Sequence, residues 1–461
     1  MTPPVPFRGD VYAFLKEIMN ATHSSDIQKK YLQTSLDGEG VGVSLWLPSL
    51  FSAEAIPSAI ITFVALLMFL QLGVKWEVST LLCGLLTLPW MMKSWLREPL
   101  QHWGHYLAQL RFVEAVSFLL LVALAFSFTA RTDSQLWVLL CLLLLCLFSA
   151  WHELVSHMYY DSRLRGPQQR FYNVARMSFS QAAVILTYGV MIVAVGSLEV
   201  FYHNRRQVIA ESWSTAVYLL AGVYLLLLLW NLCCLPQNDP SPVGERRQVV
   251  KELLPAASLS HGRVVCGEAF ALFLLLLPQA LMFHARVLYL MASQTEGGLG
   301  CSLQEVGLAQ GTVGVIAFSV GLILGHRLID KNGKRARLLF SMLIPLGLSP
   351  SVYWLMTQYP PANLLWLCVA TATAQFCFGY GLNLCSLVLR HLFGHRYEST
   401  INYLYVPLIS FVMLPAMAAS GWLVARLGFE HFFTLDALLA IFACMAGWCI
   451  IYQYQDSNNC S

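Results

Sequence analysis

Charged residues are scarce in this chain. Lys, Arg, Asp and Glu make up 11% of its 461 residues, whereas a soluble domain carries about a quarter. Hydrophobic residues reach 57%, and the mean hydropathy is +0.61. A soluble core of this length does not need so much apolar surface, so the composition excludes a soluble globular protein.

Two other features are missing. No Lys/Arg-rich patch is interleaved with aromatic residues, so we expect no nucleic-acid partner. Residues 1–45 contain Asp10, Glu17 and Lys29 and lack a continuous apolar core, so we expect no cleavable signal peptide. The first apolar segment must then direct membrane insertion itself.

A disulfide framework is also missing, although the chain has 13 cysteines. Most of them lie inside long apolar segments, and only Cys301 is predicted to reach the outer side of a membrane. A lone thiol there has no partner for an intrachain disulfide.

Long apolar segments are abundant instead. A membrane-spanning helix needs about 20 predominantly apolar residues. The sequence predicts spans over roughly 46–71, 78–96, 112–130, 135–157, 177–199, 212–234, 266–289, 303–325, 337–356, 362–389, 400–424 and 432–453.

Basic residues indicate how these spans are oriented. Of the 28 Lys and Arg residues, 22 fall in alternate gaps between the spans. The other gaps hold Lys75, Arg131, Arg205, Arg206, Arg426 and Arg286, the last at a helix end. Because Lys and Arg stay on the cytoplasmic side, we predict that the N- and C-termini are both cytoplasmic.

The spans divide into two sets of six. The polar stretch 236–263, with several prolines and basic residues, lies between the sixth and seventh spans and has the composition of a linker. We therefore predict a cytoplasmic tail (1–45), a six-helix half (46–235), the linker (236–263), a second six-helix half (264–454) and a C-terminal tail (455–461). Two related halves are typical of transporters.

A loop after the eighth span carries a recognisable pattern. Gly325–Arg335 reads GHRLIDKNGKR and resembles the signature loop of the major facilitator superfamily, although His326 replaces the usual glycine. The resemblance assigns a conformational role to Asp330, Lys331, Gly333, Lys334 and Arg335.

Within that superfamily the chain, over roughly 46–440, resembles the AmpG-type muropeptide permeases. The matching stretches are Ser52–Pro57, Leu88–Lys93, Ala150–Glu153, Gly297–Gly300, Gly311–Gly314, Gln375–Phe376, Gly379–Gly381, Gly421–Trp422 and Leu427–Phe433. Several charges of the family pattern are neutral here, at Leu276, Gln279 and Ala374, and His157 replaces an acid. The resemblance implies an all-α fold of twelve helices, a bacterial inner membrane as the location, and import of a muropeptide or related cell-wall sugar-peptide.

Ionisable residues inside spans are candidates for function because an intramembrane charge costs about 2.5–3.5 kcal/mol. Glu54 precedes Pro57, which we expect to break the first helix and open a polar pocket for substrate. His152, Glu153 and His157 form a titratable cluster in the fourth span, which is suited to proton coupling. The alternative is that this end of the fourth helix lies at the hydrated cytoplasmic surface and has no coupling role. Four acids are expected to reach headgroup water near span ends: Glu114, Glu199, Glu211 and Glu268.

Uncharged polar residues in the second half suit a polyhydroxyl or amide-rich solute. They are Gln279, His284, Gln375, Tyr380, Asn383, Asn402 and Tyr405. Amides and glycines also serve in helix packing, so a packing role for these residues is the alternative to solute binding.

An enzymatic function is disfavoured by spacing. A zinc protease needs two His at i and i+4, but His152 and His157 are five apart. We predict no catalytic residues, metal or cofactor, and a monomer in the lipid bilayer that carries a small-molecule solute, with protons as a candidate coupling ion. The alternatives are a facilitated transporter of a sugar, peptide or drug, and a polytopic membrane enzyme or receptor.

Overall fold

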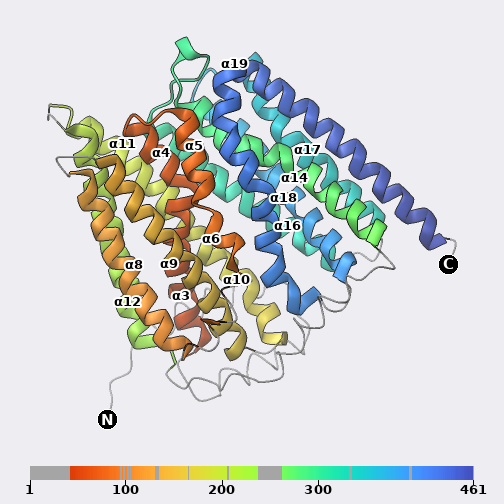
Figure 1. Ribbon diagram of the computed structural model, residues 1–461, viewed down its shortest axis with the longest axis horizontal. Helices are drawn as coiled ribbons and strands as arrows, with labels where there is room; N and C mark the ends of the chain where they lie inside the picture. The colour runs from red at the N-terminus through yellow and green to blue at the C-terminus, as the bar shows by residue number, and fades with distance from the viewer. Residues whose placement is uncertain are drawn as a thin grey trace.

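The computed structural model describes residues 42–459 except for 94–95, 97–98, 101–102, 104, 130–133, 165, 205–206, 237–261, 332–334 and 394–396. Some side chains at helix ends, including those of 262–272, 329–340 and 386–409, are also outside the description. All regular structure in this described part is helical (Figure 1). Helices are expected because apolar surroundings offer no water to the backbone, whose polar groups must pair within each segment.

The first half contains the helices up to Cys234. The first span is one continuous rod of α3 (Val43–Ala59), the π-helix η1 (Ile60–Val64) and α4 (Ala65–Gln71). The remaining elements are α5 (Trp76–Leu85), α6 (Leu88–Met91), α8 (Tyr106–Phe128), α9 (Ser134–Arg163), α10 (Gly166–Val184), the π-helix η2 (Ile185–Val190), α11 (Met191–Phe201) and α12 (Val208–Cys234).

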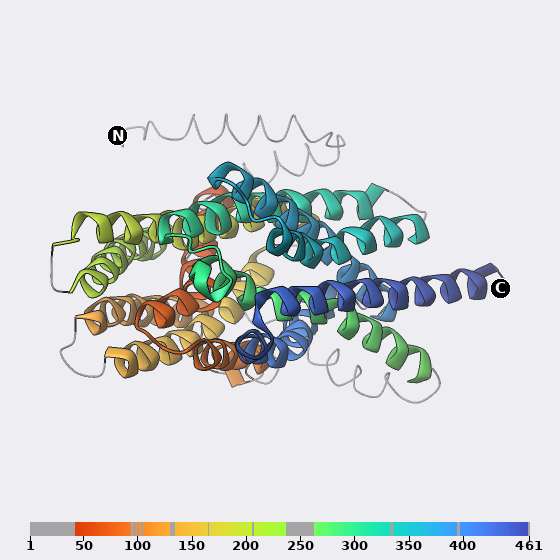
Figure 2. The same ribbon diagram turned by 90° about the horizontal axis from the view of Figure 1, so that it is seen from above.

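The second half contains the helices from Gly262 onward. Its elements are α14 (Gly262–Met291), the short 3-10 helix η4 (Gln294–Glu296), α15 (Leu303–Val306), the π-helix η5 (Gly307–Gly314), α16 (Val315–Lys331), α17 (Arg335–Gln358), α18 (Leu364–Phe393) and α19 (Tyr397–Asn459). Figure 1 shows the two halves side by side, and Figure 2 shows the same separation from above.

Twelve membrane-crossing helices follow from these elements. Nine segments of the described chain are long and apolar enough to cross a membrane. One of them, in α19, contains two helices because Gly428 has φ 74° and ψ 164°, a left-handed φ that glycine adopts without a Cβ clash. The nine segments therefore account for ten helices, and the α5–α6 pair and α17 supply the remaining two of the twelve. The predicted all-α membrane fold of two six-helix halves is thereby confirmed.

Two local predictions had different outcomes. Ser302 and Glu305 form the expected capping box at the start of α15. The predicted break at Pro57 is wrong, because α3 runs through Pro57 and continues into η1. A π-helical turn widens the helix and so absorbs a local irregularity without ending the rod.

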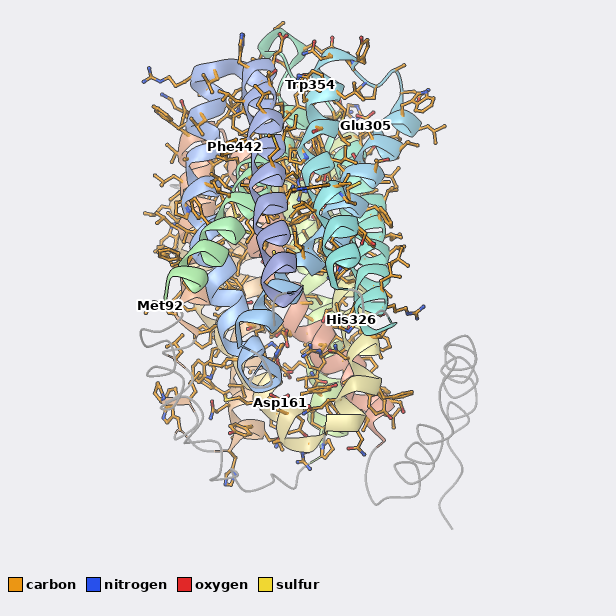
Figure 3. All side chains as sticks on the ribbon, turned by 90° about the vertical axis from the view of Figure 1, so that its right-hand side faces the viewer. Met92, Asp161, Glu305, His326, Trp354 and Phe442 are labelled. Carbon is orange, nitrogen blue, oxygen red and sulfur yellow. The ribbon has the colours of Figure 1, made fainter. Side chains whose placement is uncertain are left out.

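The two halves are packed tightly at one end of the molecule. Figure 3 shows Glu305 and Trp354 at this end and Asp161 at the opposite one; we call them the Glu305 end and the Asp161 end. Near the Glu305 end, the Thr80 hydroxyl donates to the Ala418 carbonyl at 3.2 Å. A Cβ on Gly196 would meet Gln304, and one on Gly311 would meet the Tyr188 backbone. Small residues therefore let helices of opposite halves approach closely.

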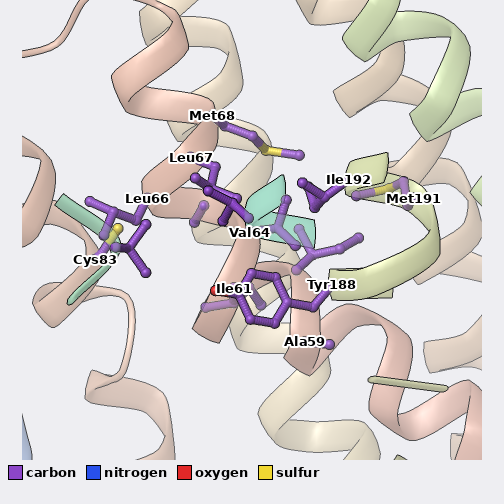
Figure 4. Packing of buried hydrophobic residues seen from close by; sticks show 14 of the residues in the cluster. Ala59, Ile61, Val64, Leu66, Leu67, Met68, Cys83, Tyr188, Met191 and Ile192 are labelled. Carbon is purple, nitrogen blue, oxygen red and sulfur yellow. The ribbon is translucent and has the colours of Figure 1, made fainter. Parts of the chain in front are cut away.

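The apolar core follows the first span. Ile61, Val64 and Met68 are buried and pack with Tyr188 and Ile192 of the fifth span (Figure 4). This packing fixes the rod α3–η1–α4 against its neighbours and so positions the polar side chains it carries.

Candidate functional site

Glu54 lies in a polar cluster between the first and fourth spans. Its carboxylate accepts a hydrogen bond from the Ser156 hydroxyl, and its second oxygen lies 3.5 Å from His157 Nε2. Ser156 and His157 belong to α9, on the same face as Glu153, because residues three and four apart are neighbours on a helix. Glu54 is 9% exposed, so these contacts replace most of its hydration.

Glu153 completes this cluster. It forms an ion pair with Lys93 and accepts a hydrogen bond from Trp90 Nε1 at 2.7 Å. One ligand atom each of Glu54, Glu153 and His157 lies within 4.8 Å of the other two. We call Glu54, Lys93, Glu153 and His157 the carboxylate cluster.

The carboxylate cluster has the donor types of a metal site but already contains a cation. Two carboxylates and an imidazole suit several divalent ions. Here the Lys93 ammonium supplies positive charge against Glu153, and the His157 imidazole lies beside Glu54. Each acid of the carboxylate cluster thus has a basic side chain beside it.

His152 does not join the carboxylate cluster, although sequence proximity grouped it with Glu153. Its Nε2 lies 3.4 Å from Glu114 Oε1, and Asn231 donates to the same oxygen at 2.7 Å. Consecutive residues on a helix point about 100° apart, so His152 faces α8 and α12 while Glu153 faces α6.

Glu114 corrects a sequence-based expectation. We expected it to reach headgroup water at a helix end, but it is 0% exposed. Its environment is a buried polar group within the first half that also contains Tyr224 and Ser117. Glu199 and Glu211 are partly exposed, and the side chain of Glu268 lies outside the described residues.

The amides predicted to bind substrate are largely engaged in helix contacts. Gln279 donates to the Leu346 carbonyl at 2.7 Å, and Gln375 donates to Gln310 at 3.3 Å. Asn383 donates to carbonyls of Leu322, Gly379 and Tyr380, each at 3.2 Å. These contacts join α14 to α17 and α18 to η5 and α16, the packing alternative that the sequence left open.

Tyr380 follows the same pattern, since its hydroxyl donates to Ser341 at 3.2 Å. Asn402 and Tyr405 lie in α19, but their side chains are outside the described residues. Gly333 and Lys334 of the predicted conformational loop also lie outside, as do the side chains of Asp330, Lys331 and Arg335.

His284 does face a cavity between the halves. This cavity is small and is lined by Thr62, Phe63 and Leu66 of the first span, Tyr188 of the fifth, and Phe283, His284, Arg286 and Val287 of the seventh. Phe63 and Tyr188 stack at 5.2 Å between ring centroids. Side chains of both halves thus form its walls.

Arg286 is the residue of this cavity that sequence reasoning missed. We placed it at an exposed helix end, but it is 4% exposed and its guanidinium lies 4.8 Å from the Phe283 ring centroid. A buried cation–π contact contributes about 2 kcal/mol, less than the several kcal/mol that burial of an ion costs. Its position five residues before the end of α14 gave no signal, because burial there depends on the first-half helices that line the same cavity.

Comparisons with solved structures define the fold. A D-xylose–proton symporter matches with TM-score 0.57 and 15% identity over 88% of this chain and 96% of that one. The nucleoside transporter NupG matches with TM-score 0.63 and 12% identity over 88% and 98%. A bacterial homologue of the human lysosomal transporter Spinster, inward-facing and unoccupied, matches with TM-score 0.63 and 13% identity over 94% and 99%.

This likeness is one of fold, since all three identities are low. No family model and no curated protein sequence matches the chain. The chain has the fold of major facilitator transporters.

Proposed function

We propose that this protein is a secondary transporter that moves a small organic solute by alternating access. The observation that carries the proposal is the cavity between the halves, with Thr62 and Phe63 on one side and Phe283 and Arg286 on the other. The same halves are in close contact at the Glu305 end. A site shared by two halves changes its exposure when one half rocks against the other.

The carboxylate cluster supports proton coupling. Glu54, Glu153 and His157 are titratable groups in mutual contact within the first half, and an intramembrane group of this kind is a candidate proton relay. We propose that Glu153 and His157 carry the coupling proton and that Glu54 links this step to the solute, because it contacts both Ser156 and His157.

The cargo that we propose is a muropeptide or related sugar-peptide, moved inward across a bacterial inner membrane by a monomer with cytoplasmic termini. Support for this cargo comes from the sequence resemblance. The alternative is facilitated transport of another solute, such as a sugar, peptide or drug. The engaged amides of the second half, such as Gln279, weaken the argument for an amide-lined muropeptide site, and solved structures with this fold include transporters of a sugar and of a nucleoside.

Uptake into liposomes tests this proposal. Purified protein should admit labelled anhydromuropeptide faster than protein-free liposomes do, and an inward proton gradient should raise accumulation. Labelled D-xylose and uridine, run in parallel, represent the alternative cargo. Uptake of either without a gradient effect would replace the muropeptide proposal, and no uptake of any probe would overturn transport of these solutes.

A further inference from the structure

Arg286 and Tyr188 place two hydrogen-bond donors at the same cavity. Arg286 belongs to α14 of the second half and Tyr188 to η2 of the first, and both line the cavity. Arg286 is 4% exposed and Tyr188 is 2% exposed. They interact electrostatically across the boundary between the halves.

Both donors lack an acceptor within the described chain. Arg286 Nε and the Tyr188 hydroxyl are buried there and have no hydrogen-bond partner among its residues. Buried polar groups are almost always paired with protein, ordered water or a ligand, and a ligand in this cavity would supply acceptors to both donors at once.

No carboxylate of the described chain neutralises Arg286. Glu54 is engaged with Ser156 and His157, and Glu153 with Lys93 and Trp90. Both oxygens of Asp436, a buried acid of α19, also lack a partner, so Asp436 is not the counterion. The cavity therefore has an uncompensated positive charge.

We infer that the solute is an organic anion whose carboxylate or phosphate group binds between Arg286 and Tyr188; this inference rests on the transport function proposed above. An oxyanion accepts from a guanidinium with favourable geometry and has oxygens left for a phenol. Because the two donors come from opposite halves, the anion would connect the halves, while Phe63 and Phe283 would contact its apolar part. The remainder of the solute needs more space than this small cavity has, and separation of the halves would provide it.

Two matched pairs of probes test this inference. N-acetylmuramate differs from N-acetylglucosamine by a lactyl carboxylate, and glucose 6-phosphate differs from glucose by a phosphate. Binding is measured by calorimetry on the purified full chain and uptake in liposomes. We expect the parental protein to prefer the anionic member of at least one pair, and the preferred pair identifies the anionic group.

Variants assign that preference to residues. Arg286→Gln should weaken binding of the anion roughly 30-fold or more, as expected when one partner of a buried charge pair is removed, and leave the neutral member within about threefold. Arg286→Lys should retain a preference for the anion. Tyr188→Phe should weaken anion binding about tenfold, the effect of a hydrogen bond to a charged group.

Exposed residues provide the controls. Arg426 also lies over an aromatic ring, that of Trp422 at 5.7 Å, but it is exposed, so Arg426→Gln should retain the preference. Tyr218 is exposed on α12, so Tyr218→Phe should also retain the preference. Retained binding of the neutral member shows that a variant is folded.

The outcomes separate the two proposals. Equal binding of both members of each pair, unchanged in Arg286→Gln, would overturn the inference and leave transport standing if either member enters liposomes. If the parental protein neither binds nor admits any of the four probes, both the inference and the proposed transport of such solutes are overturned.

Discussion

Glu153 is the residue whose neighbourhood differs most from its sequence context. The sequence pairs it with His152, but the structure pairs it with Lys93 and Trp90. His152 instead lies beside Glu114, which accepts a hydrogen bond from Asn231. Adjacent titratable residues on one helix thus belong to two separate polar groups. They should respond differently to substitution.

We expect Glu153→Gln to abolish gradient-driven accumulation of the solute and to leave downhill exchange largely intact. The substitution removes a titrating carboxylate of the carboxylate cluster but does not touch the cavity at Arg286. Accumulation and exchange in the same liposomes measure the two activities. A Glu153→Gln protein that accumulates solute like its parent would show that Glu153 only pairs with Lys93 and Trp90 and does not carry the coupling proton.

Two variants serve as comparisons for this prediction. His152→Gln should retain coupling, since His152 contacts Glu114 outside the carboxylate cluster. The same substitution should lower the free energy of unfolding by about 1–3 kcal/mol, because Glu114 loses its contact with the imidazole. Glu54→Gln should instead weaken solute binding, and a calorimetric measurement distinguishes that loss from a loss of coupling.

Cys301 should react slowly with maleimide although it lies in a loop. Burial, and secondarily the charge of Glu305, raises the pKa of this thiol to about 12, and the thiolate is the reactive form. At neutral pH its labelling should be about a hundredfold or more slower than that of an ordinary thiol with a pKa near 8.5. The rate should rise steadily as the pH increases to about 9, because the thiolate fraction grows with pH below the pKa.

An engineered thiol provides the comparison. Thr295 is exposed in the neighbouring η4 helix, so Thr295→Cys in a Cys301→Ser background should label rapidly. Equal rates for the two thiols, measured on purified protein, would mean that Cys301 is more accessible than its packing indicates.

At the scale of the elements, the π-helices η2 and η5 were not predicted from the sequence. Gly311 of η5 packs against the backbone of Tyr188 in η2, and Gly307 packs against Val193 of α11. The Gly311–Gly314 stretch was recognised as a motif, but its contact lies in the other half of the chain. Periodicity predicts a helix and does not reveal the partner that a small residue admits.

Gly311→Ala should therefore disturb the contact between the halves. A Cβ there would collide with the Tyr188 backbone, which cannot rotate away as a side chain does, so we expect a loss of about 1–3 kcal/mol. At Gly222 in α12 an added Cβ would have nothing within 4 Å, and Gly222→Ala should be neutral or stabilising by up to about 1 kcal/mol. Thermal unfolding of the Gly311→Ala and Gly222→Ala proteins measures the two effects. Equal changes in stability would contradict a tight contact at Gly311.

At the scale of the whole molecule, the two ends are distinguished by the chain segments that lie there. Cys301 and Glu305 lie at the Glu305 end, whereas the chain after α12 approaches the Asp161 end, where Tyr159 donates to the Pro236 carbonyl at 3.0 Å. The basic bias of the sequence predicts that the Asp161 end faces the cytoplasm.

Reporter fusions test this orientation. Fusions at Ser461 and after Gly300 should report opposite sides of the membrane, with Ser461 inside. An impermeant maleimide on intact spheroplasts should label Thr295→Cys much faster than Cys233, which is exposed near the other end of α12. A periplasmic Ser461, or preferential labelling of Cys233, would mean that the orientation is inverted.

The sequence by itself determined the helices, their approximate limits and their division into two sets. Twelve apolar segments leave the backbone no alternative to internal hydrogen bonding, and the Ser302–Glu305 capping box marks one helix start directly. Glu54, Glu153 and His157 also stand out in the sequence as ionisable residues within apolar segments, because rarity of charge is visible without coordinates.

Only the tertiary structure decided which of these residues meet. The pairing of Glu153 with Lys93, the burial of Glu114 and the facing of Arg286 and Tyr188 across the cavity join residues far apart in the chain. Helical periodicity fixes the face on which a side chain lies, but the rotation and depth of each helix are set by packing against its neighbours. Burial and charge compensation depend on that rotation and depth, and so the cavity and its unpaired cation emerge only in the folded molecule.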